Sequence, residues 1–135
     1  MVARRSASNC YTLQSTGNPP RMATPLNILI VDDELNIRKT LSACLEAEAH
    51  RVTSVGTAQD AMQAVARQTF DLAFVDIVLG RDTGLDLFPK MLAESPWTKV
   101  VVITAYATIE TAVESMKRGA TDYLPKPSRP SRWSC

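Results

Sequence analysis

Five polar side chains follow apolar runs of this sequence and together could bind a metal ion and a phosphoryl group. The run over residues 70–75 is nearly continuous in apolar residues and ends in a carboxylate, and the first apolar run ends in two carboxylates. A hydroxyl follows the fourth run and an ammonium group follows the fifth; the five residues are Asp32, Asp33, Asp76, Thr104 and Lys126. If these ends meet, all five groups converge in one site.

The chemistry of this set is that of phosphoryl transfer to a carboxylate. Three clustered carboxylates repel one another and therefore need a cation. Oxygen ligands with room for water suit Mg²⁺, and the backbone carbonyl of Val78 could supply a further ligand. Asp76 would act as the nucleophile toward phosphorus, while Lys126 and the cation neutralise the transferred oxygens and Thr104 donates a hydrogen bond. We therefore predict a Mg²⁺-dependent phosphoacceptor at Asp76.

These side chains meet only if the apolar runs lie side by side in a parallel sheet. Strands are expected over residues 26–31, 51–55, 70–76, 100–103 and 122–124. The first four are each followed by a segment of helical character, and strands that alternate with helices form βαβ units with right-handed crossovers. The carboxyl ends of parallel strands share one edge of the sheet, which is where open α/β sheets bind ligands. The predicted fold class is therefore α/β.

The helices are predicted from apolar spacing and from capping residues. The first has apolar residues at Ile37, Leu41, Cys44 and Leu45, and the second begins at Thr57. The third is expected from about Asp86 to Glu94; with Asp86 as N-cap, Pro89 occupies N3, where its missing N–H has no intrahelical partner. The fourth begins at Thr108, ends at Gly119 and carries an apolar stripe of Ile109, Ala112, Val113 and Met116.

Composition limits the 135 residues to one domain between two tails. Residues 1–25 are rich in Ser, Thr, Asn and Pro and are expected to be disordered, while residues 26–127 form the folded domain. Residues 128–135 are expected to be an irregular, truncated tail, because Pro130 and the lack of an amphipathic period leave no fifth helix. Lack of that helix would expose apolar surface on the first and fifth strands and favour dimerisation.

Charge and hydropathy exclude two kinds of partner. Residues 32–126 contain ten basic and fourteen acidic residues, a balance of −4, which is unsuited to nucleic-acid phosphates. No run approaches the roughly 18 apolar residues of a membrane span. The amino-terminal segment also lacks the apolar core of a signal peptide. We therefore expect a cytoplasmic domain that contacts neither nucleic acid nor membrane directly.

Several motifs in order resemble the receiver domain of bacterial two-component response regulators, over residues 26 to about 127. They are Ile-Leu-Ile-Val-Asp32-Asp33-Glu34, Asp76 with Gly84 eight residues later, Thr104-Ala105, and Asp122-Tyr123-Leu124-Pro125-Lys126-Pro127. The segments Thr-Ala-Tyr and Gly-Ala-Thr-Asp-Tyr-Leu-Pro-Lys-Pro are similar to those of receivers of nitrogen-regulator-type transcriptional activators, including alginate regulators. This resemblance implies a flavodoxin-like, doubly wound five-stranded sheet of order 2-1-3-4-5 with helices on both faces.

The resemblance also implies roles for individual residues. A sensor histidine kinase would donate the phosphoryl group to Asp76, with Asp33 and Asp76 as direct Mg²⁺ ligands and Asp32 acting through water. Thr104 would then shift toward the phosphate and Tyr123 would rotate inward. The fourth helix, fifth strand and fifth helix would thereby present a new face for an output such as transcription control, and a homodimer could form through the fourth helix and fifth strand. The Lys126–Pro127 bond is expected to be cis.

One departure from the family and one further residue concern the loops around Asp76. Gly80 stands where the family often has proline, so a looser loop after Asp76 is expected. Tyr106, two residues after Thr104, is placed to shield the phosphoryl group from water.

Three other functions are compatible with parts of the sequence. A phosphohydrolase of the haloacid-dehalogenase type would need Asp-x-Asp-x-Thr at the nucleophile, and Asp76-Ile77-Val78 lacks the second acid. A flavodoxin-like binder would need a Ser, Thr or Gly-rich loop after the first strand, where the chain has three acids. The third alternative is a receiver fold used only for interaction.

Overall fold

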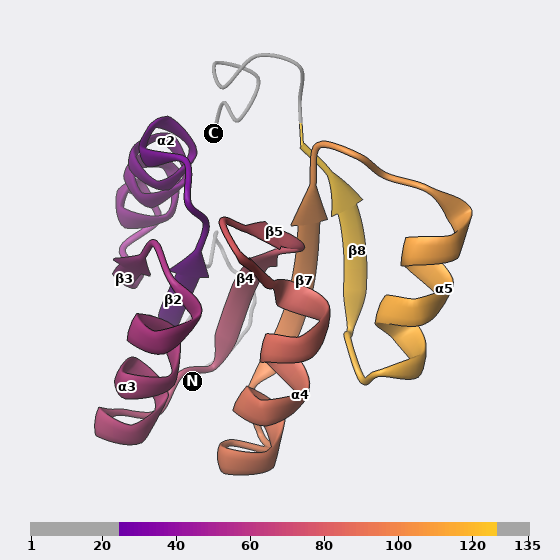
Figure 1. The fold of residues 1–135 in the computed structure, drawn as a ribbon. Coiled ribbons are helices and arrows are strands. Elements are labelled where there is room, and N and C mark those ends of the chain that lie inside the picture. The colour runs from indigo at the N-terminus through magenta and orange to yellow at the C-terminus, as the bar shows by residue number, and fades with distance from the viewer. Residues whose placement is uncertain (1–24, 127–135) are drawn as a thin grey trace, which may run out of the picture.

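A five-stranded parallel sheet forms the centre of the computed structural model, which describes residues 25–126 (Figure 1). The strands are β2 (Asn27–Val31), β3 (Arg51–Val55), β4 (Leu72–Asp76), β7 (Lys99–Thr104) and β8 (Asp122–Pro125). Their order in the sheet is β3-β2-β4-β7-β8, and all four neighbouring pairs are parallel. In chain order this is 2-1-3-4-5, so the predicted fold class and topology are confirmed.

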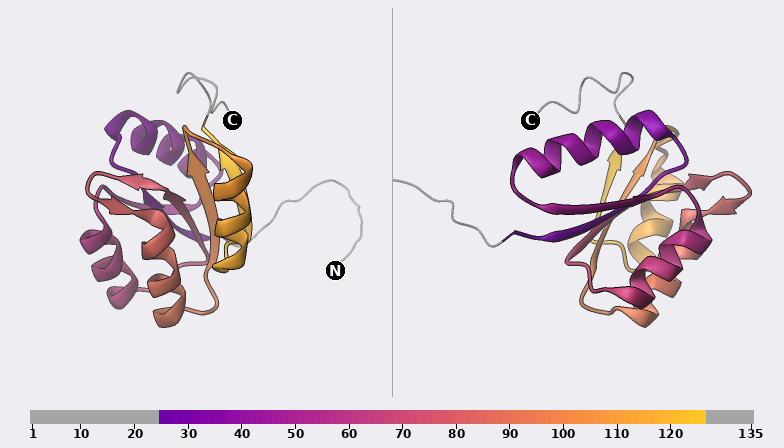
Figure 2. Two further views of the ribbon diagram at one scale, coloured as in Figure 1. Left: turned by 45° about the vertical axis from the view of Figure 1, so that its right-hand side comes forward. Right: turned by 90° about the vertical axis from the view of Figure 1, so that its left-hand side faces the viewer.

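Four helices of the described range cover the two faces of the sheet, as the two views of Figure 2 show. They are α2 (Leu35–Ala47), α3 (Ala58–Arg67), α4 (Gly84–Glu94) and α5 (Ile109–Lys117). Leu41 of α2 packs against Ile28 and Ile30, whereas Leu29 and Val31 face the opposite side, toward α3 and α4. Between residues 25 and 126, no helix is long and apolar enough to cross a membrane.

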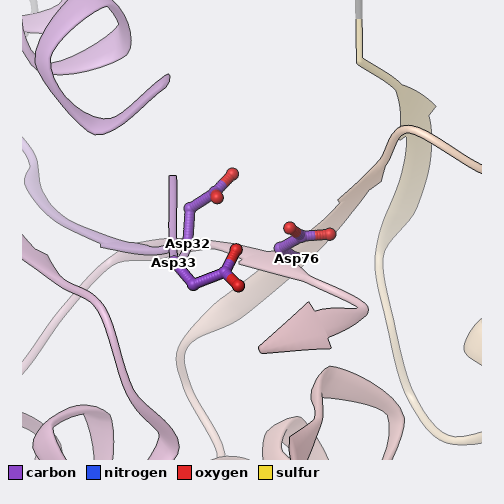
Figure 3. Close-up of side chains that lie close together, drawn as sticks. All are labelled: Asp32, Asp33 and Asp76. Atoms are coloured by element: carbon purple, nitrogen blue, oxygen red, sulfur yellow. The ribbon is translucent and has the colours of Figure 1, made fainter. Parts of the chain in front are cut away.

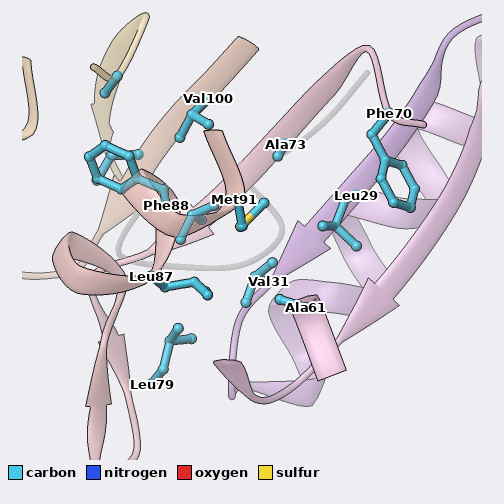
Figure 4. Close-up of a cluster of buried hydrophobic side chains, with 13 residues drawn as sticks. Leu29, Val31, Ala61, Phe70, Ala73, Leu79, Leu87, Phe88, Met91 and Val100 are labelled. Atoms are coloured by element: carbon cyan, nitrogen blue, oxygen red, sulfur yellow. The ribbon is translucent and has the colours of Figure 1, made fainter. Parts of the chain in front are cut away.

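The main hydrophobic core lies between the sheet and the helices α3 and α4 (Figure 4). Phe88 and Met91 of α4 are almost completely buried there. The central strands are near-continuous in apolar residues because both of their faces are covered, which is typical of parallel sheets. This rigid core fixes the ends of β2, β4 and β7 at one edge of the sheet.

Helix α4 begins earlier than predicted, and Pro89 lies in its interior. Its N-cap is Thr83, whose hydroxyl accepts the N–H of Leu85 at 3.2 Å. The N3 position expected for Pro89 was therefore wrong. The first residue is Gly84, and a Cβ there would lie 2.1 Å from the carbonyl oxygen of Asp76. Only glycine permits this contact. It joins the end of β4 to the start of α4, two segments that a sequence pattern describes independently of each other.

The segment after Asp76 is a short hairpin rather than a loosened loop. Strands β5 (Val78–Leu79) and β6 (Asp82–Thr83) pair antiparallel. Gly80 lies in the two-residue turn with a φ of +64°, a left-handed conformation that favours glycine. The glycine therefore forms a tight turn, contrary to the expected looser loop.

The exposed apolar surface differs in part from the expected one. The stripe of α5 faces solvent, with Ile109 84%, Val113 48% and Met116 49% exposed, while the buried residue of this helix is Ser115. On the fifth strand, Leu124 is 37% exposed, as expected. Exposure of the first strand was a wrong expectation, because α2 covers its isoleucines.

Several predictions fall on residues 1–24 and 127–135, outside the range that the structure describes. They are the disorder of the amino-terminal segment, the cis peptide bond between Lys126 and Pro127, and the irregular tail without a fifth helix. These remain predictions.

Candidate functional site

Three carboxylates gather at the carboxyl ends of neighbouring strands (Figure 3). Asp32 follows β2 directly and Asp76 is the last residue of β4; the residues that precede them, Val31 and Val75, are paired in the sheet. With Asp33, their ligand oxygens all lie within 4.8 Å of one another. Asp32 and Asp76 are buried and Asp33 is exposed, so the cluster opens to solvent on one side.

The ammonium group of Lys126 lies among these carboxylates. Its Nζ atom is 2.8 Å from Oδ2 of Asp76 and 2.8 Å from Oδ2 of Asp32, and only 4% of the lysine side chain is exposed. The backbone N–H of Lys126 donates to the carbonyl of Thr104 at 2.7 Å, which fixes the lysine at the end of β8 beside β7. The convergence predicted for the carboxylates and the lysine is present.

Two residues that contribute to this arrangement were missed by the sequence analysis. Glu34 accepts a hydrogen bond from Nζ of Lys126 at 2.6 Å. Its position directly after Asp33 in the sequence could have identified Glu34 as a site residue. Arg38 donates from Nη1 to the backbone carbonyl of Asp32 at 2.5 Å, one turn into α2. No sequence pattern distinguishes this arginine from a solvated one.

Burial sets the electrostatics of the cluster. It raises the pKa of Asp32 to about 6, against the opposing effect of the ion pair with Lys126. Burial also raises the pKa of Asp76, again opposed by Lys126. For Lys126 itself burial would lower the pKa, but the ion pairs with Asp32, Asp76 and Glu34 outweigh it and raise the pKa above its usual value. The lysine is therefore a firmly charged partner for partly destabilised carboxylates.

The donor set fits a hard divalent cation. Four carboxylates (Asp32, Asp33, Glu34 and Asp76) and one ammonium group leave a charge of −3 when all are ionised. Oδ2 of Asp32 is buried and, although 2.8 Å from the ammonium, has no hydrogen bond of good geometry. Carboxylate oxygens that lack full compensation are the ligands that Mg²⁺ prefers.

A hollow of about 240 Å³ opens beside Asp76 and could accept a cation with its waters and a phosphoryl group. Its lining consists of Asp33, Glu34, Asp76, Val78, Ala105, Tyr106 and Lys126. The N–H of Val78 donates to Oδ1 of Asp76 at 3.2 Å, so the loop and the carboxylate are held together. Val78 therefore lies beside Asp76, and the ligand role of its carbonyl stays a prediction.

Thr104 and Tyr123 are not among the residues that line this hollow. Thr104 is buried at the end of β7, and its hydroxyl accepts the N–H of Tyr106 at 3.1 Å. The hydroxyl of Tyr123 lies 2.5 Å from Oγ1 of Thr111 and accepts the N–H of Thr108 at 3.3 Å. Tyr123 is thus bonded to the amino-terminal end of α5 instead of the carboxylates.

The backbone of Asp76 is held from two sides. The N–H of Gly84 donates to the carbonyl of Ile77 at 2.7 Å, and the Cα of Gly84 lies against the Asp76 carbonyl. On the other side, the N–H of Ile77 donates to the carbonyl of Ile103 in β7 at 3.3 Å. The first turn of α4 is therefore a direct support of the candidate nucleophile.

Comparisons with known proteins point in the same direction. Residues 28–133 match the family model of the response regulator receiver domain. The alginate biosynthesis transcriptional regulatory protein AlgB of Pseudomonas aeruginosa is 45% identical over 105 residues, which are 78% of this chain and 23% of AlgB. The chain thus spans about a quarter of the length of such relatives.

Two solved structures are also similar. One is a response regulator protein from Burkholderia pseudomallei with a phosphorylated aspartic acid, calcium ion and citrate, with a TM-score of 0.74, 33% identity, and coverage of 79% of this chain and 63% of that one. The other is the beryllofluoride-activated NtrC4 receiver domain dimer, with a TM-score of 0.72, 31% identity, and coverage of 79% and 88%.

Proposed function

The chain belongs to the response regulator receiver domain family, with relatives among the nitrogen-regulator-type transcriptional activators, and on this premise we propose that Asp76 is its phosphoacceptor. The phosphoryl donor is a sensor histidine kinase, and the reaction requires Mg²⁺. The observation that carries the proposal is the position of the Lys126 ammonium, 2.8 Å from both Asp76 and Asp32 and 2.6 Å from Glu34.

Each residue of the cluster has a separate role in this transfer. An oxygen of Asp76 attacks the phosphorus of a phosphohistidine, forming a P–O bond as the P–N bond breaks and the imidazole leaves. Lys126 stabilises negative charge on the transferred oxygens. Asp33, Asp76 and the Val78 carbonyl would hold Mg²⁺ directly and Asp32 would hold it through water, and the ion would supply further positive charge for those oxygens.

Phosphorylation changes the bonding of two neighbouring side chains. The hydroxyl of Thr104 exchanges its hydrogen bond from Tyr106 for one that it donates to a phosphoryl oxygen. Tyr123 leaves the hydroxyl of Thr111 and rotates toward the space next to Thr104. Because Tyr123 bonds to the first turn of α5, its departure frees that turn and changes the face of α5 and β8.

The face of α5 and β8 is the proposed output surface. Its exposed apolar residues, which include Ile109, Val113 and Met116, suit homodimerisation, and the similar NtrC4 receiver is a dimer. The output is control of a transcriptional domain of the kind found in the longer relatives, with no direct nucleic-acid contact by this domain. A cytoplasmic location belongs to the same proposal, because the kinase takes its phosphoryl group from ATP.

Two other functions compete with phosphoacceptance. A phosphohydrolase would need a general acid two residues after Asp76, where the chain has Val78. A receiver fold used only for interaction would not need a buried lysine between two buried aspartates. Removing charged groups from water costs free energy, and an interaction surface gains nothing from it. We therefore propose a domain that catalyses no turnover beyond its own phosphorylation and dephosphorylation.

Intact-mass measurement tests the proposal. Incubation with Mg²⁺ and acetyl phosphate should add one phosphoryl group to the wild-type chain and none to Asp76→Asn, and EDTA should prevent the addition. A folded wild-type chain that gains no mass, or an Asp76→Asn variant that gains the same mass, would contradict it. Sustained phosphate release from p-nitrophenyl phosphate would indicate the phosphohydrolase instead.

A further inference from the structure

The interior proline of α4 leaves a backbone carbonyl that a residue from another helix satisfies. Pro89 has no N–H, so it cannot donate to the carbonyl of Leu85 four residues earlier. Nη1 of Arg118, the C-cap residue of α5, donates to that carbonyl at 2.7 Å. A hydrogen bond that would normally lie within one helix is thus replaced by a bond between two helices.

The same guanidinium group makes two ion pairs. Nη1 lies 3.0 Å from Oδ1 of Asp86 in the first turn of α4, and Nε lies 2.6 Å from Oε2 of Glu114 in α5. The side chain of Asp86 is 67% exposed and that of Glu114 is 43% exposed, so these pairs contribute little free energy by themselves. Their effect is to orient the guanidinium toward the Leu85 carbonyl.

The turn that Arg118 holds is the one that supports the phosphoacceptor. Leu85 follows Gly84, whose N–H donates to the carbonyl of Ile77 and whose Cα lies against the carbonyl of Asp76. A continuous path of direct contacts therefore runs from Asp76 through the first turn of α4 to the carboxyl-terminal end of α5.

The two ends of α5 are held by different kinds of contact. The amino-terminal end bonds to the hydroxyl of Tyr123 through Thr108 and Thr111, and these contacts are lost if Tyr123 rotates. The carboxyl-terminal end is held by Arg118 through bonds that do not involve Tyr123. Rotation of Tyr123 would release one end of the helix and leave the other end fixed.

We propose that Arg118 is a positioning residue that fixes the carboxyl-terminal end of α5 to the first turn of α4, so that phosphorylation moves α5 about that end. The moving part is the amino-terminal half of the helix, which carries Ile109 and Val113 of the exposed apolar stripe. The movement rests on the proposed phosphorylation of Asp76, whereas the fixed end does not.

Hydrogen exchange in the unphosphorylated protein, measured residue by residue by NMR, tests the fixed end. Loss of a hydrogen bond from a charged donor should speed exchange in the first turn of α4 by roughly tenfold in Arg118→Ala. Lys117→Ala is the matched control, because it removes a neighbouring cation for which no bond to α4 is seen in the described range. Its exchange should match that of the wild type.

Pro89→Ala supplies a rescue that an ordinary surface ion pair would not show. The new N–H of residue 89 can donate to the Leu85 carbonyl, so Arg118→Ala should have a clearly smaller effect in the Pro89→Ala background. An undiminished effect in that background, or unchanged exchange in Arg118→Ala, would overturn the proposal. If Arg118→Ala does not fold, Arg118→Lys replaces it, because an ammonium group cannot bond the carbonyl and both carboxylates in the same way.

The same measurement with Mg²⁺ and acetyl phosphate tests the movement. In the wild-type chain, phosphorylation should change protection over residues 109–113 and leave residues 115–118 unchanged. In Arg118→Ala the change should extend to residues 115–118; confinement to residues 109–113 would overturn the proposal. Failure of the wild type to gain a phosphoryl group would contradict the proposed function and the movement, while the fixed end, tested without Mg²⁺ or phosphate, would still stand.

Discussion

Gly84→Ala is the sharpest test of how the fold positions Asp76, the proposed phosphoacceptor. Alanine is intrinsically preferred to glycine within a helix by about 1 kcal/mol, and Gly84 has no positive φ, so local propensity favours the substitution. The new Cβ, however, would lie 2.1 Å from the carbonyl oxygen of Asp76. Contacts of a Cβ essentially never fall below 3.0 Å, so the two backbones must separate by about 0.9 Å.

The expected effects follow from that displacement. Overpacking in a well-packed region destabilises by about 1–3 kcal/mol, and the partner atom here is backbone that cannot change rotamer. Displacement of a reacting group by about 1 Å can lower a rate by roughly 100-fold. We therefore expect Gly84→Ala to lose about 2–3 kcal/mol of unfolding free energy and to accept the phosphoryl group from acetyl phosphate 10- to 100-fold more slowly, on that same scale.

Urea unfolding followed by circular dichroism and intact-mass time courses measure these two quantities. Gly80→Ala is the matched control: its φ of +64° disfavours alanine by about 1–2 kcal/mol, yet no atom lies within 4 Å of the added Cβ. It should be destabilised and still be phosphorylated at nearly the wild-type rate. A Gly84→Ala chain with wild-type stability and rate would refute the claim that α4 supports Asp76.

Further predictions concern Lys126, Tyr106 and Thr111. Lys126→Met should slow phosphorylation at least tenfold, as measured by intact mass, which is the scale of other lost electrostatic contacts to a transferred group. Mg²⁺ should raise the melting temperature of this variant more than that of the wild type. An unchanged phosphorylation rate would refute the role of Lys126. Tyr106→Ala should lose its phosphoryl group several-fold faster after acetyl phosphate is removed, because the side chain that partly shields the group from water is gone. An unchanged lifetime of the phosphoryl group would show that Tyr106 does not shield it. Thr111→Val should weaken protection of the first turn of α5 by about 1 kcal/mol in hydrogen exchange before phosphorylation, whereas Ser115→Ala should not; equal effects would indicate only loss of helix stability.

The parts of the fold that sequence predicted are those set by local pattern. Alternating apolar runs and helical periods predicted the five strands, whereas their order was implied by the family resemblance; Thr57 and Thr108 were correctly identified as N-caps. Capping depends on residues three positions apart, so it can be read from a short window. The convergence of Asp76 and Lys126 follows from the same pattern, because parallel strands end at one edge.

The parts that sequence did not predict depend on contacts between distant segments. The start of α4 depends on Gly84 fitting against the Asp76 backbone, and the interior position of Pro89 depends on a donor from Arg118, 33 residues after Leu85. The apolar stripe of α5 faces solvent because the helix packs on Ser115, which hydropathy ranks as polar. In each case tertiary contact outweighs the local signal.

The charges of the site give a reason why the proposed phosphorylation of Asp76 would need both the lysine and a metal ion. Asp32, Asp33, Glu34 and Asp76 with Lys126 carry −3 when ionised, and a divalent cation brings this to −1. A phosphoryl group on Asp76 replaces one negative charge with about two. The net charge of the phosphorylated site is therefore about −2 with the cation and about −4 without it. In a buried setting, where like charges are weakly screened, that difference opposes transfer strongly. Lys126 alone is already shared by three carboxylates and cannot offset it, so the residues that position Asp76 would also make its proposed phosphorylation depend on a divalent cation.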